Sequence, residues 1–255
     1  MPEEIAIREC TTVEELEACV QLQRQVFALP DLEISPRRHL IVSRLVGGWT
    51  LGAFVRSELV GFVHLMIAVR GANEIFGYSH MMAVAVPYQS KGIGARLKWA
   101  QRDRALAEGR NFITWTWEPM RVRNAHFNLN RLGVTVESYA ENLYGADYIT
   151  EPDEKVDVPR GIDSDRLFAS WDLRSERVTV LASGGQPQPL GPPVVTIEIP
   201  PNWPLMLKED VDAARREQLR LREEFQRAFA AGLVCAGFDR NATRPCYVLY
   251  ERERL

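Results

Sequence analysis

Hydrophobic and polar positions along the first seventy residues predict alternating helices and strands. Residues 5–10 (IAIREC) alternate as a strand does, and Thr11 or Thr12 followed by two glutamates predicts the start of a helix that runs to about Leu29. A shorter helix is expected over residues 37–46, where two glycines end it. Residues 49–55 and 59–69 then predict a hairpin, and the second of these strands is almost wholly apolar. We therefore expect that strand in the centre of a sheet.

Residues 80–109 (HMMAVAVPYQSKGIGARLKWAQRDRALAEG) predict a strand, a glycine loop and a helix in succession. The apolar run from His80 to Val86 has the length of a strand, which we expect to begin near Tyr78 and to stop at Pro87. Two glycines, Gly92 and Gly94, follow, and the apolar positions after them lie near helical spacing up to Gly109.

The rest of the chain predicts further strands and helices and one break in composition. Strands are expected over residues 112–117, 134–139 and 166–173, with a helix over 124–133. Residues 182–193 (ASGGQPQPLGPP) cannot build a core, which predicts a linker or a long surface loop. Beyond them we expect a strand at 194–199, a helix at 208–231 whose apolar stripe Gln218 interrupts, and strands at 233–238 and 246–250. The predicted domains are 1–181 and a β-α-β-β subdomain, 194–255, that completes the first sheet or makes a dimer contact.

Composition narrows the classes of partner. The 255 residues carry a net charge of −3 with both signs interspersed, which argues against nucleic-acid and membrane partners and favours a small molecule, with a homodimer possible. The four cysteines show no metal-binding spacing, so we expect no metal and free thiols, although a Cys235–Cys246 disulfide stays open. The acidic N-terminus has no hydrophobic signal core, and the longest apolar run is too short for a membrane span. We expect a cytoplasmic protein.

The glycine loop suits a pyrophosphate. A helix that starts in such a loop offers unpaired N–H groups and the positive end of its dipole, and glycine lets an anion approach without meeting a Cβ. The phosphate loop of nucleotide hydrolases is excluded because Ala95 and Arg96 follow Gly94, where that loop has Lys-Ser/Thr. The dinucleotide fingerprint is excluded because its third glycine would be Leu97.

The same residues resemble the acyl-CoA loop of the GNAT superfamily of N-acyltransferases. The resemblance lies in the pattern Gln/Arg-x-x-Gly-x-Gly/Ala, with Gln89 in place of the usual arginine, and in the Asn-containing turn and Leu-Gly end of the helix at 124–133. It covers roughly residues 5–174 in the order βααβββαβαββ and implies an α/β fold with an α+β mixed sheet. It also implies acetyl-CoA or another acyl-CoA as co-substrate, with the loop amides on the pyrophosphate and the preceding strand along the pantetheine arm. The implied binding residues are Met82, Ala83, Val84, Gln89, Ser90, Lys91, Gly92, Ile93, Gly94, Ala95, Asn124 and Phe127.

Direct attack by an amine needs a proton acceptor, because only the neutral amine is a nucleophile. If Val84 faces CoA, strand alternation places Met82, His80 and Tyr78 on the same face, which makes His80 the first candidate base. A hydrogen-bonded core histidine is the alternative. Glu118, at the end of strand 112–117, is the second candidate, with a role as a solvated end or helix cap as its alternative.

The resemblance leaves the acid for the departing thiolate unassigned. Leu129 occupies the position where many members of the superfamily carry a tyrosine. Tyr139 or Tyr144 is the replacement that the sequence offers, with Tyr144 our choice, unless the thiolate leaves unassisted.

Basic residues near the expected cleft raise the question of acceptor binding. Arg121 and Arg123 can clamp a carboxylate on the acceptor or on a dicarboxylic acyl group, or they can be solvated surface residues. The same question applies to the Arg37-Arg38-His39 group, whereas Trp115 and Trp117 are expected in the core.

These residues together predict an acyl-CoA-dependent N-acyltransferase. It would move an acetyl or related acyl group to the primary amine of a small molecule by direct attack. An N-succinyltransferase acting on amino acids and a non-catalytic acyl-CoA-binding sensor or scaffold are the alternatives.

Overall fold

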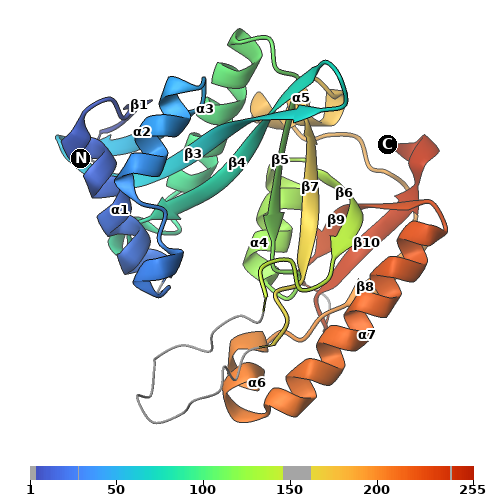
Figure 1. Ribbon diagram of the computed structural model, residues 1–255. Helices are drawn as coiled ribbons and strands as arrows, with labels where there is room; N and C mark the ends of the chain where they lie inside the picture. Colours follow the sequence, from blue (N-terminus) through green and yellow to red (C-terminus); the bar gives the residue numbers. More distant parts are fainter. Residues whose placement is uncertain (1–3, 28, 146–161, 242) are drawn as a thin grey trace. The chain divides into compact units, whose positions relative to one another are not determined.

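The computed structural model describes residues 4–27, 29–145, 162–241 and 243–255 (Figure 1). The chain divides into two compact units, Met1–Thr114 and Trp115–Leu255, so the division falls inside strand β5 (Phe112–Trp117). The sequence predicted a boundary at 182–193 instead. The segments before and after residues 182–193 belong to one unit, because strand 233–239 pairs with strand 135–140.

Unit 1 contains the first four strands, the beginning of β5 and the helices between them. Its elements are β1 (Ile5–Glu9), α1 (Val13–Phe27), the 3-10 turn η1 (Asp31–Glu33), α2 (Arg37–Leu45), β2 (Trp49–Val55), β3 (Glu58–Arg70), β4 (Glu74–Val84), the 3-10 turn η2 (Val86–Tyr88) and α3 (Ile93–Ala107). The sequence placed the start of β4 near Tyr78, four residues late. The turn before it is confined to residues 71–73, with Gly71 at φ 59°, so pairing with β3 already begins at Glu74.

β3 lies at the centre of the unit 1 strands, as its apolar run predicts. The strand order is β1-β2-β3-β4-β5, antiparallel as far as β4, while β4 and β5 run parallel. This mixture of parallel and antiparallel pairs confirms the predicted α/β class with a mixed sheet.

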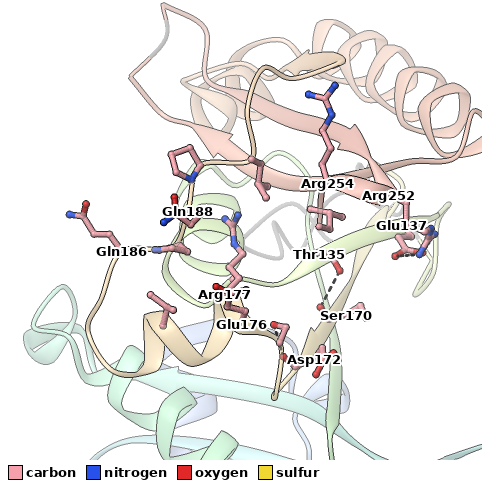
Figure 2. Close-up of a pocket in the computed structure, with 17 residues that line it drawn as sticks. Thr135, Glu137, Ser170, Asp172, Glu176, Arg177, Gln186, Gln188, Arg252 and Arg254 are labelled. Atoms are coloured by element: carbon pink, nitrogen blue, oxygen red, sulfur yellow. Dashed lines mark hydrogen bonds and ion pairs between the residues drawn. The ribbon is translucent and has the colours of Figure 1, made fainter.

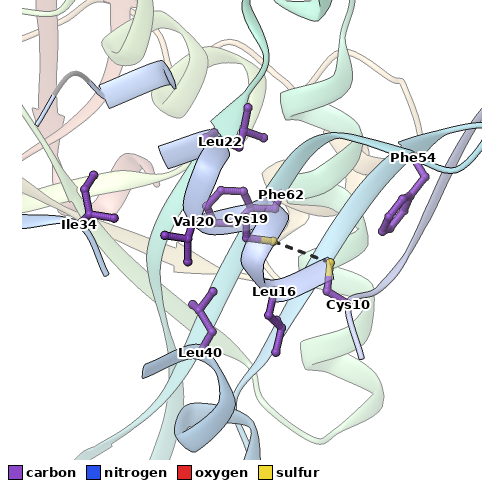
Figure 3. Close-up of a cluster of buried hydrophobic side chains, with 10 residues drawn as sticks. Cys10, Leu16, Cys19, Val20, Leu22, Ile34, Leu40, Phe54 and Phe62 are labelled. Atoms are coloured by element: carbon purple, nitrogen blue, oxygen red, sulfur yellow. Dashed lines mark hydrogen bonds between the residues drawn. The ribbon is translucent and has the colours of Figure 1, made fainter. Parts of the chain in front are cut away.

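Helices pack on both faces of these strands. On one face, residues of α1 and α2 form a buried cluster with strand residues (Figure 3), whose members are Cys10, Leu16, Cys19, Val20, Leu22, Ile34, Leu40, Phe54, Phe62 and Ala83. On the other face Leu97 of α3 comes close to Gly61 of β3, where an added Cβ would lie 3.3 Å from the leucine Cδ1. Strands covered on both faces must be apolar on both, which explains why β2 is buried along its whole length.

β4 contains an irregularity at His80. Met81 pairs with His64 of β3 and Ser79 pairs with Leu65, so His80 is an extra residue without a partner on β3. An extra residue reverses the alternation of faces on one side of the bulge. Met82 therefore faces α3, whereas Tyr78 faces the same side as His64, and the expected common face of Met82, His80 and Tyr78 is wrong.

Unit 2 contains the end of β5 and the remaining elements. These are α4 (Val122–His126), the π-helical turn η3 (Phe127–Arg131), β6 (Thr135–Ala140), β7 (Arg166–Asp172), α5 (Glu176–Ala182), β8 (Val195–Glu198), α6 (Trp203–Glu209), α7 (Val211–Ala230), β9 (Leu233–Asp239), β10 (Cys246–Glu251) and the 3-10 turn η4 (Arg252–Arg254). The strand order is β5-β7-β6-β9-β10-β8. Trp115 and Trp117 are buried, as expected for core residues.

The C-terminal segment extends the sheet of unit 2. β9 lies antiparallel to β6, with Cys235 opposite Val136, and β10 and β8 follow it. Gln218, the polar residue within the apolar stripe of α7, is buried, and its side-chain amide is satisfied because it donates to the Asp163 carbonyl oxygen at 2.6 Å. The sequence analysis missed α5, which begins at a capping serine: the Ser175 hydroxyl accepts from the backbone N–H of Val178.

The four cysteines are free thiols, all of them buried, and Cys10 and Cys19 have their sulfur atoms 4.0 Å apart (Figure 3).

Among the described residues, no helix is both long enough and apolar enough to span a bilayer.

Candidate functional site

The glycine loop of unit 1 exposes backbone donors at the start of α3. Gly92 is the N-cap residue, at φ 81°, and no side chain caps the helix. Within the described part of the chain, the N–H groups of Ile93, Gly94 and Ala95 have no recorded acceptor. The loop is tied to the preceding strand because the Gln89 amide donates to the Val84 carbonyl oxygen at 3.0 Å. The result is an anchored loop with three donors at the positive end of a helix.

Space is left open over both glycines. A Cβ added at Gly92 would meet nothing within 4 Å, and one added at Gly94 would meet only the Met82 side chain, at 3.5 Å or more. Packing inside the chain therefore does not require a glycine at position 94. A ligand that approaches the backbone closely would require one.

The edge of β4 next to this loop is also open. β4 pairs with β5 only at Gly77 and Tyr78, opposite Ile113 and Thr114, although β4 continues to Val84. Its last residues thus keep backbone groups on the side away from β3. An extended ligand arm can add to such an edge as a further strand would.

Three histidines, His39, His64 and His80, lie close together on the face of the unit 1 strands that α1 and α2 cover. The ring centroid of His80 lies 5.5 Å from that of His39 on α2 and 6.2 Å from that of His64 on β3. The Ser35 hydroxyl lies 3.1 Å from His80 Nε2, and the Thr50 hydroxyl lies 2.8 Å from His64 Nδ1. The Nε2 atoms of His39 and His64 are buried without a hydrogen-bond partner. His80 and His39, two residues that the sequence analysis considered separately, are thus neighbours.

Burial lowers the pKa of two of these histidines, His64 and His80. Burial lowers the pKa of His64 to about 3, helped by the charges that His80 and His39 can carry. The His80 side chain is exposed, yet the protein atoms packed around its ring, and then the nearby His39, lower its pKa too. A neutral imidazole at the surface can accept a proton.

Glu118 and Arg121 hold each other in unit 2. Glu118 Oε2 accepts from Arg121 Nε at 2.6 Å, and Oε1 accepts from the Trp203 indole N–H at 2.5 Å. Both carboxylate oxygens therefore have donors from the protein. Glu118 thus anchors α6 through Trp203, which is neither the solvated end nor the helix cap that the sequence analysis gave as its alternative role.

Among the tyrosines considered as the acid, Tyr144 is the accessible one. The Tyr139 hydroxyl donates to Asp165 Oδ2 at 2.6 Å, and burial followed by this bond raises its pKa. Tyr144 is 62% exposed, with its hydroxyl 3.2 Å from the Thr116 hydroxyl. Leu129 is fully buried and provides no acid.

The remaining candidates lie on the surface of their units. Asn124 and Arg123 are exposed on α4, and Phe127 is half-buried at the start of η3. In unit 1, Arg37 pairs with Glu17 at 3.2 Å, while Arg38 is exposed.

Sequence reasoning missed the parts of unit 1 that support His80. His64 and Ser35 were not candidates, although His64 is the one histidine inside a long apolar strand, a signal that could have identified it. Lys98 of α3 was also missed: it is 3% exposed and donates to the Ser79 hydroxyl at 2.7 Å and to Gln101 Oε1 at 3.1 Å. Burial lowers its pKa well below the ordinary value. Among the described residues, no group of three or more His, Cys, Asp or Glu side chains is arranged to hold a metal ion.

Comparison with known proteins gave matches in structure alone. No protein-family model matches the sequence, and no curated protein matches it significantly. A protein described as a GNAT-family acetyltransferase, from Desulfovibrio desulfuricans, is similar in structure with a TM-score of 0.53 and 13% identity, over 67% of this chain and 99% of that one.

Two further solved structures resemble the chain. The ribosomal-protein-S18-alanine N-acetyltransferase of Escherichia coli matches with a TM-score of 0.52 and 13% identity, over 68% of this chain and 96% of its own. An N-acetyltransferase of Staphylococcus aureus Mu50 matches with a TM-score of 0.52 and 14% identity, over 67% and 99%. At such identities the likeness is one of fold. Over about two thirds of its length, this chain has the fold of the GNAT-family acetyltransferases.

Proposed function

We propose that the protein is an acyl-CoA-dependent N-acyltransferase that moves an acetyl or related acyl group to the primary amine of a small molecule. One observation carries the proposal: a loop with three open backbone donors follows directly on a strand whose last residues have no strand partner on the side away from β3. A pyrophosphate and an extended pantetheine arm need these two features, in this order.

The loop and β4 would hold the acyl-CoA. The N–H groups of residues 93–95 would bind the pyrophosphate, and the outer edge of β4 from Met82 to Val84 would pair with the pantetheine arm. Asn124 and Phe127 are further candidates for contact with that arm, through the family resemblance. The co-substrate supplies a thioester, whose carbonyl carbon is open to direct attack by an amine.

His80 would receive the proton of the attacking amine. Its lowered pKa keeps the imidazole neutral near pH 7, and its exposed edge allows transfer directly or through one water molecule. The Ser35 hydroxyl, 3.1 Å away, would fix the orientation of the ring. Tyr144 would provide a proton for the thiolate, or the thiolate would leave unassisted.

The acetyl group is the first choice of acyl group. Arg121 already pairs with Glu118, which weakens the case for a clamp that recognises a dicarboxylic acyl group, and an N-succinyltransferase acting on amino acids is the alternative. A non-catalytic acyl-CoA sensor is the second candidate function, because the buried Leu129 occupies the position of the family's acid.

Thermal denaturation with CoA, acetyl-CoA and succinyl-CoA tests the proposal. A ligand at one hundred times its dissociation constant adds about 2.7 kcal/mol to the free energy of unfolding, so one acyl form should raise the melting temperature clearly. If none of the three raises it, the proposal fails.

Release of free thiol from the preferred donor, with a panel of primary amines, then separates the enzyme from the sensor. We expect His80→Ala to lower kcat by about a hundredfold or more without weakening donor binding, and free imidazole to restore part of the rate. Donor binding without thiol release from any amine would favour the sensor.

A further inference from the structure

Unit 2 contains a hollow that the proposed reaction does not use. It has a volume of about 550 Å³ and lies between the end of α4, strands β9 and β10, and residues 187–190. We call residues 186–190 the proline strap. A second hollow of about 560 Å³ adjoins it (Figure 2), and both are lined by the strap and by Arg177 of α5. A volume of this size matches the usual range for small-molecule sites.

The proline strap is a wall of these hollows rather than a free linker. It is fixed at both ends: the Gly185 N–H donates to the Val180 carbonyl oxygen at 2.9 Å, and Arg254 donates to the Pro192 carbonyl oxygen at 3.1 Å. Between these points, residues 186–191 make no recorded hydrogen bond to any described residue. Only side-chain contacts and whatever lies beneath the strap therefore support it.

Two residues that line the first hollow each have a buried polar atom without a hydrogen-bond partner. Arg177 donates through Nη2 to the Leu129 carbonyl oxygen at 3.1 Å, but its Nε has no partner, and neither has Nδ1 of His126. Leaving a buried donor unpaired costs about 1–3 kcal/mol, and more when the group is charged. A guanidinium N–H can be satisfied only by an acceptor, because arginine has no acceptor of its own.

The charge of the hollow favours an anion. Arg240 lines it beside His126, and burial, then the charges of Arg240 and Arg131, lower the pKa of that histidine. The lining contains one carboxylate, Asp239, whose Oδ1 already accepts from the backbone N–H of Asn241 at 2.9 Å. Apolar surface surrounds these groups and comes from Pro187, Pro189, Leu190, Val248 and Tyr250.

We propose that this hollow binds a small organic oxyanion, a carboxylate or phosphate on an apolar body, with Arg177 and His126 holding the anion and the proline strap covering the body. The anion would accept hydrogen bonds from Arg177 Nε–H and from a protonated His126 Nδ1, the two atoms that lack partners. Arg240 would add long-range attraction. The site lies wholly within unit 2, and its binding can be measured without any acyl transfer. Failure of this proposal would therefore leave the proposed function unaffected, and failure of the proposed function would leave this proposal unaffected.

Titration with phenyl phosphate, benzoate and inorganic phosphate tests this site on the full chain. Each probe is added at constant ionic strength, with chloride as reference, while the NMR signal of the Arg177 Nε–H and the melting temperature are followed. We expect a saturable change with phenyl phosphate or benzoate, and a weaker one with inorganic phosphate, which lacks the apolar body. If no probe gives a saturable change beyond that of chloride, the proposal is overturned, and the hollow holds only water.

Variants locate the binding. Arg177→Lys keeps the charge but loses the Nε–H, and His126→Gln removes the imidazole Nδ1. Each variant should weaken binding of the anion by about tenfold or more. Arg216→Met, on the exposed surface of α7, removes a positive charge elsewhere on unit 2 and should leave binding unchanged. Equal binding by all three variants would place the anion elsewhere and overturn the proposal. If Arg177→Lys does not fold, His126→Gln and the NMR signal decide.

Discussion

Alanine in place of each loop glycine separates the needs of the fold from those of a ligand. Gly94 lies in the first turn of α3 without a positive φ, so Gly94→Ala should raise the free energy of unfolding by about 0.4–1 kcal/mol, mainly by restricting the unfolded chain. Gly92 lies at φ 81°, where an L side chain costs roughly 1–2 kcal/mol, so Gly92→Ala should lower it. At about 2–4 °C per kcal/mol, the two melting temperatures should move in opposite directions.

Binding of CoA should weaken in both variants. The new Cβ would enter open space, where nothing lies within 4 Å at position 92 and only the Met82 side chain at position 94. Loss of one charge-assisted hydrogen bond, roughly 1.5–3 kcal/mol, corresponds to about a tenfold or larger rise in the dissociation constant. Calorimetric titration with CoA and thermal melting without ligand measure the two effects separately.

Gly109 provides a matched control at the other end of α3. It lies at φ 77° with open space around its Cβ position, as Gly92 does, but it is remote from the loop in sequence. Gly109→Ala should therefore cost stability as Gly92→Ala does while binding CoA normally. If Gly94→Ala binds CoA as tightly as the parent protein, the backbone of this loop does not hold the pyrophosphate and the reasoning fails.

Further predictions concern Lys98, Glu118 and the four cysteines. Near pH 10.4, where the lowered lysine pKa no longer costs stability, Lys98→Met should cost about 1–3 kcal/mol in urea unfolding by leaving the Ser79 hydroxyl without its donor. In the parent, stability should rise with pH up to about 10.4, since the unfolded chain binds one more proton than the native chain there; an equal slope in the variant would refute the lowered lysine pKa. Glu118→Gln should destabilise the protein by about 1.5–3 kcal/mol through its weaker bond to Trp203 while kcat changes little, and a large loss of kcat in a stable variant would restore Glu118 as a catalytic candidate. The four buried cysteines should resist iodoacetamide in the native protein and react after unfolding, as mass spectrometry of digests would show; rapid native alkylation would contradict their burial.

The elements of unit 1 could be predicted from local signals because each boundary has a local cause. The glycines at 47 and 109 lie just after the ends of α2 and α3, as the sequence analysis predicted. The start of β4 could not be placed, because Glu74 belongs to a polar stretch and joins the strand only through its pairing with Arg70 of β3.

The two compact units do not divide at residues 182–193, because composition reports local core-forming capacity and not strand pairing, whereas the pairing of β9 with β6 agrees with the expectation that the C-terminal segment completes the first sheet. Residues 182–193 lack the apolar side chains of a core, yet the segments before and after them share a sheet through β6 and β9. Strand pairing across about a hundred residues leaves no mark in the sequence between the partners. The pattern of β9 therefore predicts a strand and not its neighbour.

The face of His80 depends on a single extra residue. Strict alternation from Val84 assigns His80 to the face of Met82, but the bulge opposite His64 and Leu65 gives β4 one residue more than its partner. His80 is that extra residue, and its ring centroid lies 6.2 Å from that of His64, which burial and the neighbouring histidines keep neutral. A charged side chain in place of His64 would instead alter the proton affinity of His80 at short range, through a medium that screens poorly. The proton affinity of the surface imidazole therefore depends on a buried residue sixteen positions earlier, and a pairing register connects the two.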